Sequence, residues 1–152
     1  MTSTVPLRRL EAQIMVDHPV LLSEDLENLL ALPPDERWDV GQSYRTSPNS
    51  PELRYRFSRW AIGVATDSIA NLTDAIGVLT KRIQGMEDNF RMLPSGSIVS
   101  LTLFVTEPDS VIGFGMEAEA VRLLARINAG IEVSLVVASP GGPESGEDGV
   151  RS

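Results

Sequence analysis

The chain has 152 residues, with 21 acidic and 13 basic side chains, a formal net charge of −8 and no cysteine. This length fits one domain that buries about two thirds of its unfolded surface, and the lack of cysteine excludes disulfides and thiolate metal sites. The excess of acidic residues argues against binding to nucleic-acid phosphates. No apolar run is near the ~20 residues that a membrane helix needs, so we expect a soluble cytoplasmic protein with no membrane partner. We also expect no cofactor and no metal.

The first elements expected are a strand and a short helix. Apolar and polar residues alternate over Leu10–Val16, which is typical of a strand, and Asp17–Pro19 ends it. Ser23 is expected to cap a helix that runs to about Ala31. The residues expected to face the core from this helix are Leu22, Leu26, Leu29 and Leu30.

A hairpin is expected in the Arg37–Arg59 segment. It would pair Trp38–Tyr44 with Leu53–Phe57 around a turn in Thr46–Pro51. Within its second strand, alternation assigns the aromatic residues Tyr55 and Phe57 to the core and the arginines to the opposite face.

The apolar positions then change phase. Trp60, Ile62 and Val64 occupy even positions, whereas the preceding apolar residues occupy odd ones. Such a shift predicts a bulge or bend near Ser58–Arg59, because side chains alternate strictly along a strand. Trp60 is therefore expected to be a core anchor.

Two helices and a strand are expected next. Asp67 or Ser68 caps a helix that Gly85 ends, and Met86–Leu93 adds a second, short helix. The buried stripe of the first helix is expected to be Ile69, Leu72, Ile76, Leu79 and Ile83. A further strand is expected over Val99–Val105.

The segment Gly113–Val137 predicts a loop, a helix, a tight stop and a strand. The helical stripe consists of Ala120, Val121, Leu123, Leu124 and Ile127. Gly130 is expected to take the left-handed conformation that ends the helix. Apolar residues alternate over Ile131–Val137, which predicts a strand with one buried face.

These elements favour the α+β class, with a mixed or largely antiparallel sheet of four to five strands and helices mainly on one face. A ferredoxin-like relative is the nearest named architecture. Residues 1–138 are expected to form one domain. Residues 139–152 are rich in Gly, Pro and acid, so we expect a disordered tail.

The chain resembles the bacterial "domain of unknown function 4279" family. The resemblance runs from about Leu10 to Ala138 and rests on the order and spacing of several short motifs. These are Ser23-Glu24-Asp25-Leu26, the Leu29–Pro33 run, Gly41, Trp60, Asn71-Leu72, Gly113–Met116, Glu119, Leu123-Leu124-Ala125 and Ala129-Gly130-Ile131. Two positions depart from the family pattern: Glu117 stands where the family often has Ser, and Ser134-Leu135-Val136 replaces an Asp-aliphatic-Tyr strand. The resemblance implies a fold and a bacterial setting, but no activity.

Few residues point to catalysis. His18 is the only histidine, so a catalytic triad or a histidine-rich metal site is poorly supplied, and a place in a loop at the strand end is the simpler interpretation. Gly113-x-Gly115 lacks the third glycine of a dinucleotide fingerprint. The pairs Glu117/Glu119 and Glu87/Asp88 stand at predicted helix starts, where they interact with the helix dipole.

Two groups of residues are candidates for binding a partner or ligand. The first is the basic cluster Arg54, Arg56 and Arg59, which we expect on an exposed strand. The second is the apolar group Val111, Ile112 and Phe114. Together they predict a homodimer in which guanidinium groups meet the acidic surface of a second copy around an apolar centre. The sequence therefore favours a non-enzymatic protein-binding or self-associating module. The alternative is a small-ligand-binding domain or enzyme with a cleft near Arg37–Arg59.

Overall fold

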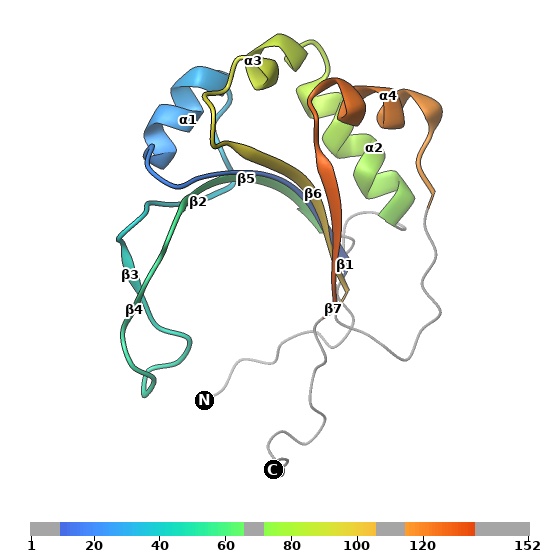
Figure 1. The fold of residues 1–152 in the computed structure, drawn as a ribbon. Coiled ribbons are helices and arrows are strands. Elements are labelled where there is room, and N and C mark those ends of the chain that lie inside the picture. Colours follow the sequence, from blue (N-terminus) through green and yellow to red (C-terminus); the bar gives the residue numbers. More distant parts are fainter. Residues whose placement is uncertain (1–9, 66–71, 106–114, 136–152) are drawn as a thin grey trace, which may run out of the picture.

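A strongly curved sheet with helices on its outer face defines the fold of the computed structural model, which describes residues 10–65, 72–105 and 115–135 (Figure 1). The strands of the main sheet are β1 (Leu10–His18), β2 (Glu36–Trp38), β5 (Ser58–Ala65), β6 (Ile98–Val105) and β7 (Gly130–Leu135). The helices are α1 (Ser23–Leu30), α2 (Leu72–Ile83), α3 (Glu87–Arg91) and α4 (Ala118–Arg126). Two short strands, β3 (Ser43–Tyr44) and β4 (Leu53–Arg54), form a separate ribbon.

The main sheet is mixed, with the strand order β2-β5-β1-β6-β7. β1 lies at its centre and runs antiparallel to both β5 and β6, whereas β6 and β7 are parallel. Parallel neighbours need a crossover, and α4 supplies it between these two strands. The α+β class, the five strands of the main sheet and the helices on one face are as predicted. The strand order of this mixed sheet does not confirm a ferredoxin-like relation.

The core lies between the helices and the convex face of the sheet. The even-numbered residues Ala12, Ile14 and Val16 of β1 are fully buried there, as their alternation predicts. α2 contributes the largest helical share, and its buried apolar residues are Leu72, Ala75, Ile76, Leu79 and Ile83. The core therefore forms where the period-2 stripe of the strands faces the period-3.6 stripe of the helices.

Trp60 is the core anchor that the sequence predicts. Its side chain is fully buried, and its Nε1 donates a hydrogen bond to the carbonyl oxygen of Leu32 at 2.9 Å. Its ring also meets the Phe90 ring edge-on, with centroids 6.1 Å apart. The predicted change of phase is a bend at Arg56 and Phe57, slightly earlier than expected, and it places Trp60 on the helix side of β5.

α1 begins differently from the prediction. Leu22 is the N-cap residue, and its N–H donates to Asp25 Oδ2 at 3.0 Å, whereas Ser23 is already helical. Leu26 and Leu30 are buried as expected, but Leu22 and Leu29 are exposed. An eight-residue helix can turn only a narrow stripe toward one sheet, so Leu29 and the N-cap residue Leu22 remain at the solvent.

Ser23 instead ties α1 to the residue that follows β2. Its N–H and its hydroxyl donate to Asp39 Oδ1 at 2.8 and 2.7 Å. These hydrogen bonds, first from the hydroxyl and then from the backbone, lower the pKa of Asp39 below its usual 3.8, and the charge of Arg37 adds to them against the opposing effect of burial. A carboxylate with a lowered pKa stabilises the fold fully above its unfolded pKa, and that stability is lost as the pH falls through the folded pKa.

Ser23→Ala is therefore expected to lower the free energy of unfolding at pH 7 by about 1–2 kcal/mol. The difference from the wild type should shrink below pH 4, because protonated Asp39 no longer accepts these bonds as an anion. Urea unfolding followed by circular dichroism between pH 3 and pH 7 measures this. Ser43→Ala, at an exposed position of β3, is the control. A Ser23→Ala deficit that stays constant over the whole range would contradict the coupling to Asp39.

The C-terminal part corrects three expectations. Asn128, with φ of +56°, holds the left-handed position after α4, while Gly130 already starts β7. Ile131 and Val133 are half exposed, because β7 is an edge strand, so the predicted buried face is wrong. Val121 is likewise exposed on α4, although the other members of its predicted stripe are buried.

Some of the remaining predictions concern residues that the structure describes, and others concern residues outside the described ranges. Gly85, with φ of +89°, ends α2 as predicted, and α3 is the predicted short helix. The caps predicted at Asp67 or Ser68 and the tail of residues 139–152 lie outside the described residues. Within the described ranges, no helix is long and apolar enough to cross a membrane.

Candidate functional site

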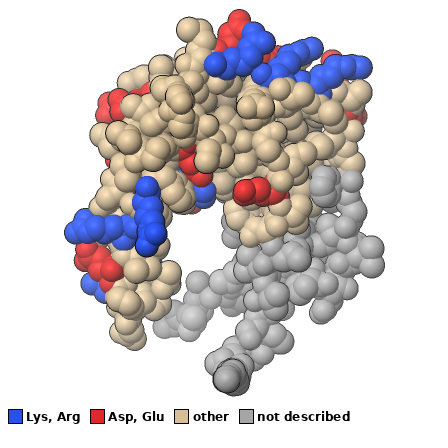
Figure 2. Space-filling view, viewed as in Figure 1, with Lys and Arg blue, Asp and Glu red and all other residues tan. Residues whose placement is uncertain are grey.

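The concave face of the sheet carries the candidate site. Odd-numbered residues of β1 point away from the helices, because the even-numbered ones are in the core, and cross-strand register aligns them with neighbours on β5 and β6. Small residues occupy much of this face, namely Ala61, Gly63, Ser100, Thr102 and Gly130. Figure 2 shows that the molecular surface is hollowed on the concave side of the sheet, beside the β3–β4 ribbon.

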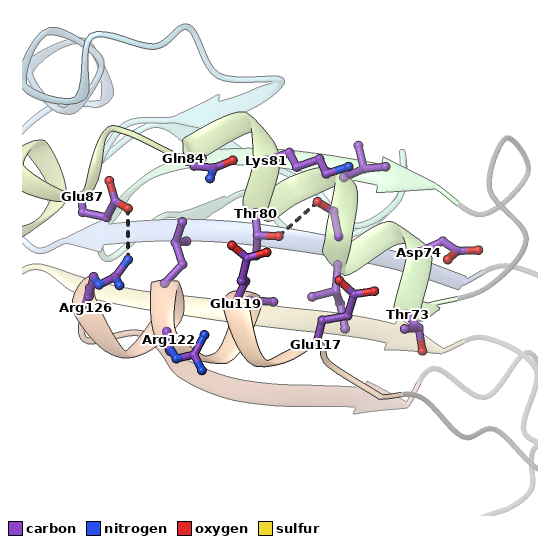
Figure 3. Close-up of a pocket in the computed structure, with 15 residues that line it drawn as sticks. Thr73, Asp74, Thr80, Lys81, Gln84, Glu87, Glu117, Glu119, Arg122 and Arg126 are labelled. Carbon is purple, nitrogen blue, oxygen red and sulfur yellow. Dashed lines mark hydrogen bonds and ion pairs between the residues drawn. The ribbon is translucent and has the colours of Figure 1, made fainter.

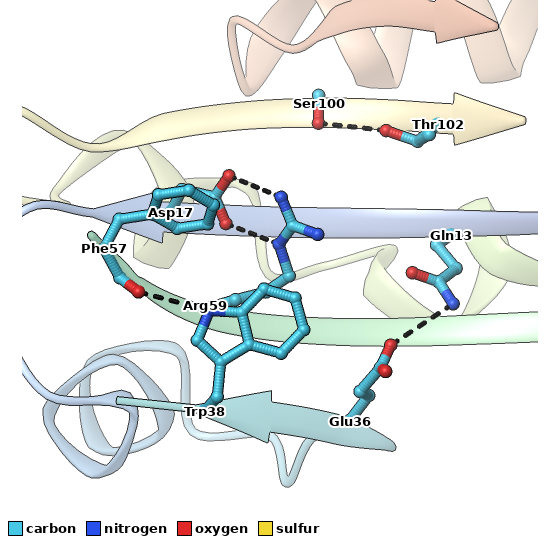
Figure 4. Close-up of polar contacts among 8 residues, drawn as sticks. All are labelled: Gln13, Asp17, Glu36, Trp38, Phe57, Arg59, Ser100 and Thr102. Atoms are coloured by element: carbon cyan, nitrogen blue, oxygen red, sulfur yellow. Dashed lines mark hydrogen bonds and ion pairs between the residues drawn. The ribbon is translucent and has the colours of Figure 1, made fainter. Parts of the chain in front are cut away.

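An ion pair lies on this face, between β1 and β5. Arg59 and Asp17 are direct cross-strand partners, and the guanidinium Nε and Nη2 donate to Oδ1 and Oδ2 at 2.8 and 2.9 Å (Figure 4). Both side chains are only about one-fifth exposed, at 20% and 21%. The bidentate geometry orients the guanidinium, and its third nitrogen points away from Asp17.

Aromatic rings surround this guanidinium and continue into the ribbon. The Arg59 Cζ lies 4.7 Å from the Trp38 ring centroid and 5.2 Å from that of Phe57. Trp38 stacks on Tyr55 at 4.2 Å and 8°, and Tyr55 stacks on Tyr44 at 4.2 Å and 20°. These rings are half-buried and lie outside the hydrophobic core, so the prediction that Tyr55 and Phe57 belong to the core is wrong. The bend before β5 turns them to the concave side.

The predicted basic cluster is divided between two structures. Arg54 lies in the ribbon, where its guanidinium donates to the carbonyl oxygen of Gly41 at 2.8 Å, and Arg56 is exposed at the bend. Only Arg59 belongs to the main sheet, and its strand is internal rather than at the edge. The apolar candidates Val111, Ile112 and Phe114 lie outside the described residues.

Gln13 is the residue that sequence reasoning missed. Its side chain is 9% exposed, and its Nε2 donates to Glu11 Oε2 at 2.8 Å and to Glu36 Oε1 at 3.5 Å. Its Oε1 is buried and has no hydrogen-bond partner within the described structure. A Cβ on Gly63 would lie 3.0 Å from Gln13 Cγ, so glycine makes room for this side chain across β5. The only signal in the sequence was the polar face of β1.

His18 has a structural role. Its Nδ1 accepts hydrogen bonds from the N–H groups of Val20 and Leu21, both at 3.0 Å, and its Nε2 lies 3.1 Å from the Ser95 carbonyl oxygen. The tautomer with its proton on Nε2 satisfies all three contacts and leaves no nitrogen for a general base. In the part of the chain that the structure covers, no three His, Asp or Glu side chains could hold a metal ion.

A second hollow of about 400 Å³ lies between α2 and α4, on the opposite side of the sheet (Figure 3). Glu117, the N-cap residue of α4, and Glu119 extend into it, and Arg126 lies at one end, where its Nη1 is 3.7 Å from Glu87 Oε2. Its charged and polar lining side chains are Thr73, Asp74, Thr80, Lys81, Gln84, Glu87, Glu117, Glu119, Arg122 and Arg126. Side chains of both charge signs line it, and none of the side chains named has a buried polar atom lacking a partner. This groove therefore gives less indication of a specific ligand than the concave face does.

Comparison of the chain with protein-family models, with curated proteins and with solved structures finds no match.

Proposed function

We propose that the protein is a non-enzymatic binding module that holds an extended segment of a partner protein against its concave face. The observation that carries this proposal is the stack of Trp38, Tyr55 and Tyr44 beside Arg59, outside the core. Aromatic and arginine side chains supply most of the binding energy in protein interfaces, since they bury large areas at low entropic cost.

The surroundings of the stack support an extended ligand. The β3–β4 ribbon continues the curve of the sheet on one side, so the aromatic rings border the concave face. A second copy of this chain is one such partner, and the predicted homodimer would be one form of the proposed function. The pocket between α2 and α4 lies away from Arg37–Arg59, so it adds no support for a ligand cleft near that segment.

A random-peptide display library, selected against the immobilised full chain, tests the proposal. Fluorescence anisotropy then gives the dissociation constants of the enriched, labelled peptides. Trp38→Ser is expected to weaken binding at least tenfold, because it removes the ring that contacts Tyr55, Phe57 and Arg59. Tyr44→Ser, at the end of the stack, should weaken binding by a smaller factor.

Val78→Ser is the matched control, since it removes an exposed apolar side chain from α2 on the other face of the sheet. It should leave the dissociation constants unchanged. Equal binding to the wild type and to folded Trp38→Ser and Tyr44→Ser variants would overturn the proposal. A selection that enriches no peptide over a blank surface would do the same.

A further inference from the structure

The amide oxygen of Gln13 is the least satisfied polar group of the concave face. Buried acceptors in folded proteins almost always have a donor, and one without a donor destabilises the fold. Gln13 Oε1 is one of two such side-chain atoms within the described residues, and the other is Ser97 Oγ. Only Gln13 lies on the candidate binding face, as a cross-strand neighbour of Gly63 and Thr102.

Two carboxylates fix the orientation of this amide. Glu11 and Glu36 both accept from Nε2, at 2.8 and 3.5 Å, so a rotated amide would place its oxygen against carboxylate oxygens. The structure therefore presents Oε1 as an acceptor, and Figure 4 shows it on the side of Gln13 that faces Arg59. Oε1 is covered in the free protein, so an incoming donor can reach it only after the surrounding groups move.

The charges around Gln13 favour a cationic donor. Glu36 is exposed at the same point of the face, while the charge of Arg59 is neutralised by Asp17. A group with several N–H donors and a positive charge can bond Gln13 Oε1 and the Glu36 carboxylate together, which a neutral amide cannot do as strongly. Glu132 on β7, the parallel partner of Thr102, adds a further carboxylate to this side of the sheet.

We propose that Gln13 and Glu36 form a subsite for a lysine or arginine side chain of the bound segment. This inference rests on the proposed function, since it names the chemistry of the partner that the concave face would receive. The aromatic stack would hold the neighbouring part of the segment, and the Gln13–Glu36 subsite would select its cationic residue.

Two peptide libraries that differ at one position test the inference. Each peptide has five random residues on either side of a central residue, which is Lys in one library and Gln in the other. Both are selected on the full chain, and each enriched Lys peptide is remade with Gln at its centre. The Lys form is expected to bind at least tenfold more tightly than its Gln form. Equal affinities, with binding still dependent on Trp38, would overturn this inference while leaving the proposed function intact.

Variants of the subsite give the second readout. In Gln13→Leu and in Glu36→Gln, the Lys-to-Gln affinity ratio is expected to fall from at least ten to about one or two. Gln13→Leu should at the same time keep or raise the melting temperature, because it removes an unsatisfied polar group. A ratio that stays near ten in both variants would overturn the assignment.

Two controls separate the subsite from general effects. Ser97→Ala removes the other unsatisfied atom and should leave the affinity ratio unchanged. Glu24→Gln removes one exposed negative charge from α1, and it should likewise keep the ratio, unless the preference for lysine merely reflects the net charge of −8. A ratio that falls equally in Glu24→Gln and Glu36→Gln would therefore contradict a specific site.

Discussion

Trp60→Ala is expected to unfold the protein or nearly so. A fully buried aromatic side chain replaced by alanine costs about 3–5 kcal/mol, out of the about 5–15 kcal/mol that a domain usually has. The substitution also removes the donor to the Leu32 carbonyl oxygen and the edge-on contact with Phe90, which join the segment after α1 and α3 to the sheet. Urea unfolding followed by circular dichroism should show a large fall in midpoint or no folded baseline.

Trp38→Ala is the matched control, because it makes the same change at the other tryptophan, which is only half buried and outside the core. It should lower the free energy of unfolding by less than half as much as Trp60→Ala. If the two variants unfold at the same urea concentration, Trp60 is no more important to the core than a residue of the concave face, and the anchor assignment is wrong.

The second large effect is expected at the ion pair on the concave face. Arg59→Met leaves the Asp17 carboxylate without its bidentate donors at a position only 21% exposed. Loss of one partner of a fully buried pair costs about 3–5 kcal/mol, and residual solvation here reduces this to about 2–3 kcal/mol. The stacking of the guanidinium on Trp38 and Phe57 is lost as well.

A double-mutant cycle separates the pair from the packing. Asp17→Leu combined with Arg59→Met should be more stable than the sum of the two single changes predicts, by about 1–2 kcal/mol, since no unpaired charge remains. The control pair is Arg37 with Glu27, whose contact is 2.6 Å long but whose side chains are 45% and 31% exposed. Its coupling should stay below about 1 kcal/mol. Additive effects at Asp17 and Arg59 would show that the ion pair is as weak as a surface pair.

Much of the sheet face that packs against the helices was predictable from local patterns in the sequence. Alternation alone identifies β1 and its buried residues Ala12, Ile14 and Val16, and the change of phase before Trp60 identifies its place in the core. These inferences succeed because side-chain direction along a strand has a period of two, whatever the strand pairs with. Alternation did not predict the exposure of Ile131 and Val133, because burial of a strand face also depends on whether the strand is central or at an edge.

Capping and turn chemistry were predictable only in part. Gly85 ends α2 as expected, yet Asn128 rather than Gly130 adopts the left-handed conformation after α4. Ser23 has the side chain of a capping residue but donates to Asp39 instead. A hydroxyl takes the strongest acceptor within reach, and an acceptor sixteen positions later in the chain comes into reach only when the fold is complete.

The amino-acid sequence by itself determined the α+β class, the order of the helices, the core stripe of β1 and the central role of Trp60, because each depends on periodicity or side-chain size within a short stretch. Only the tertiary structure decided the strand order, the bend that turns Tyr55 and Phe57 out of the core, and the meeting of Gln13, Glu36 and Arg59 on one concave face. These residues come from three strands that are far apart in the chain. Their proximity follows from cross-strand register and sheet curvature, which are properties of the assembled sheet.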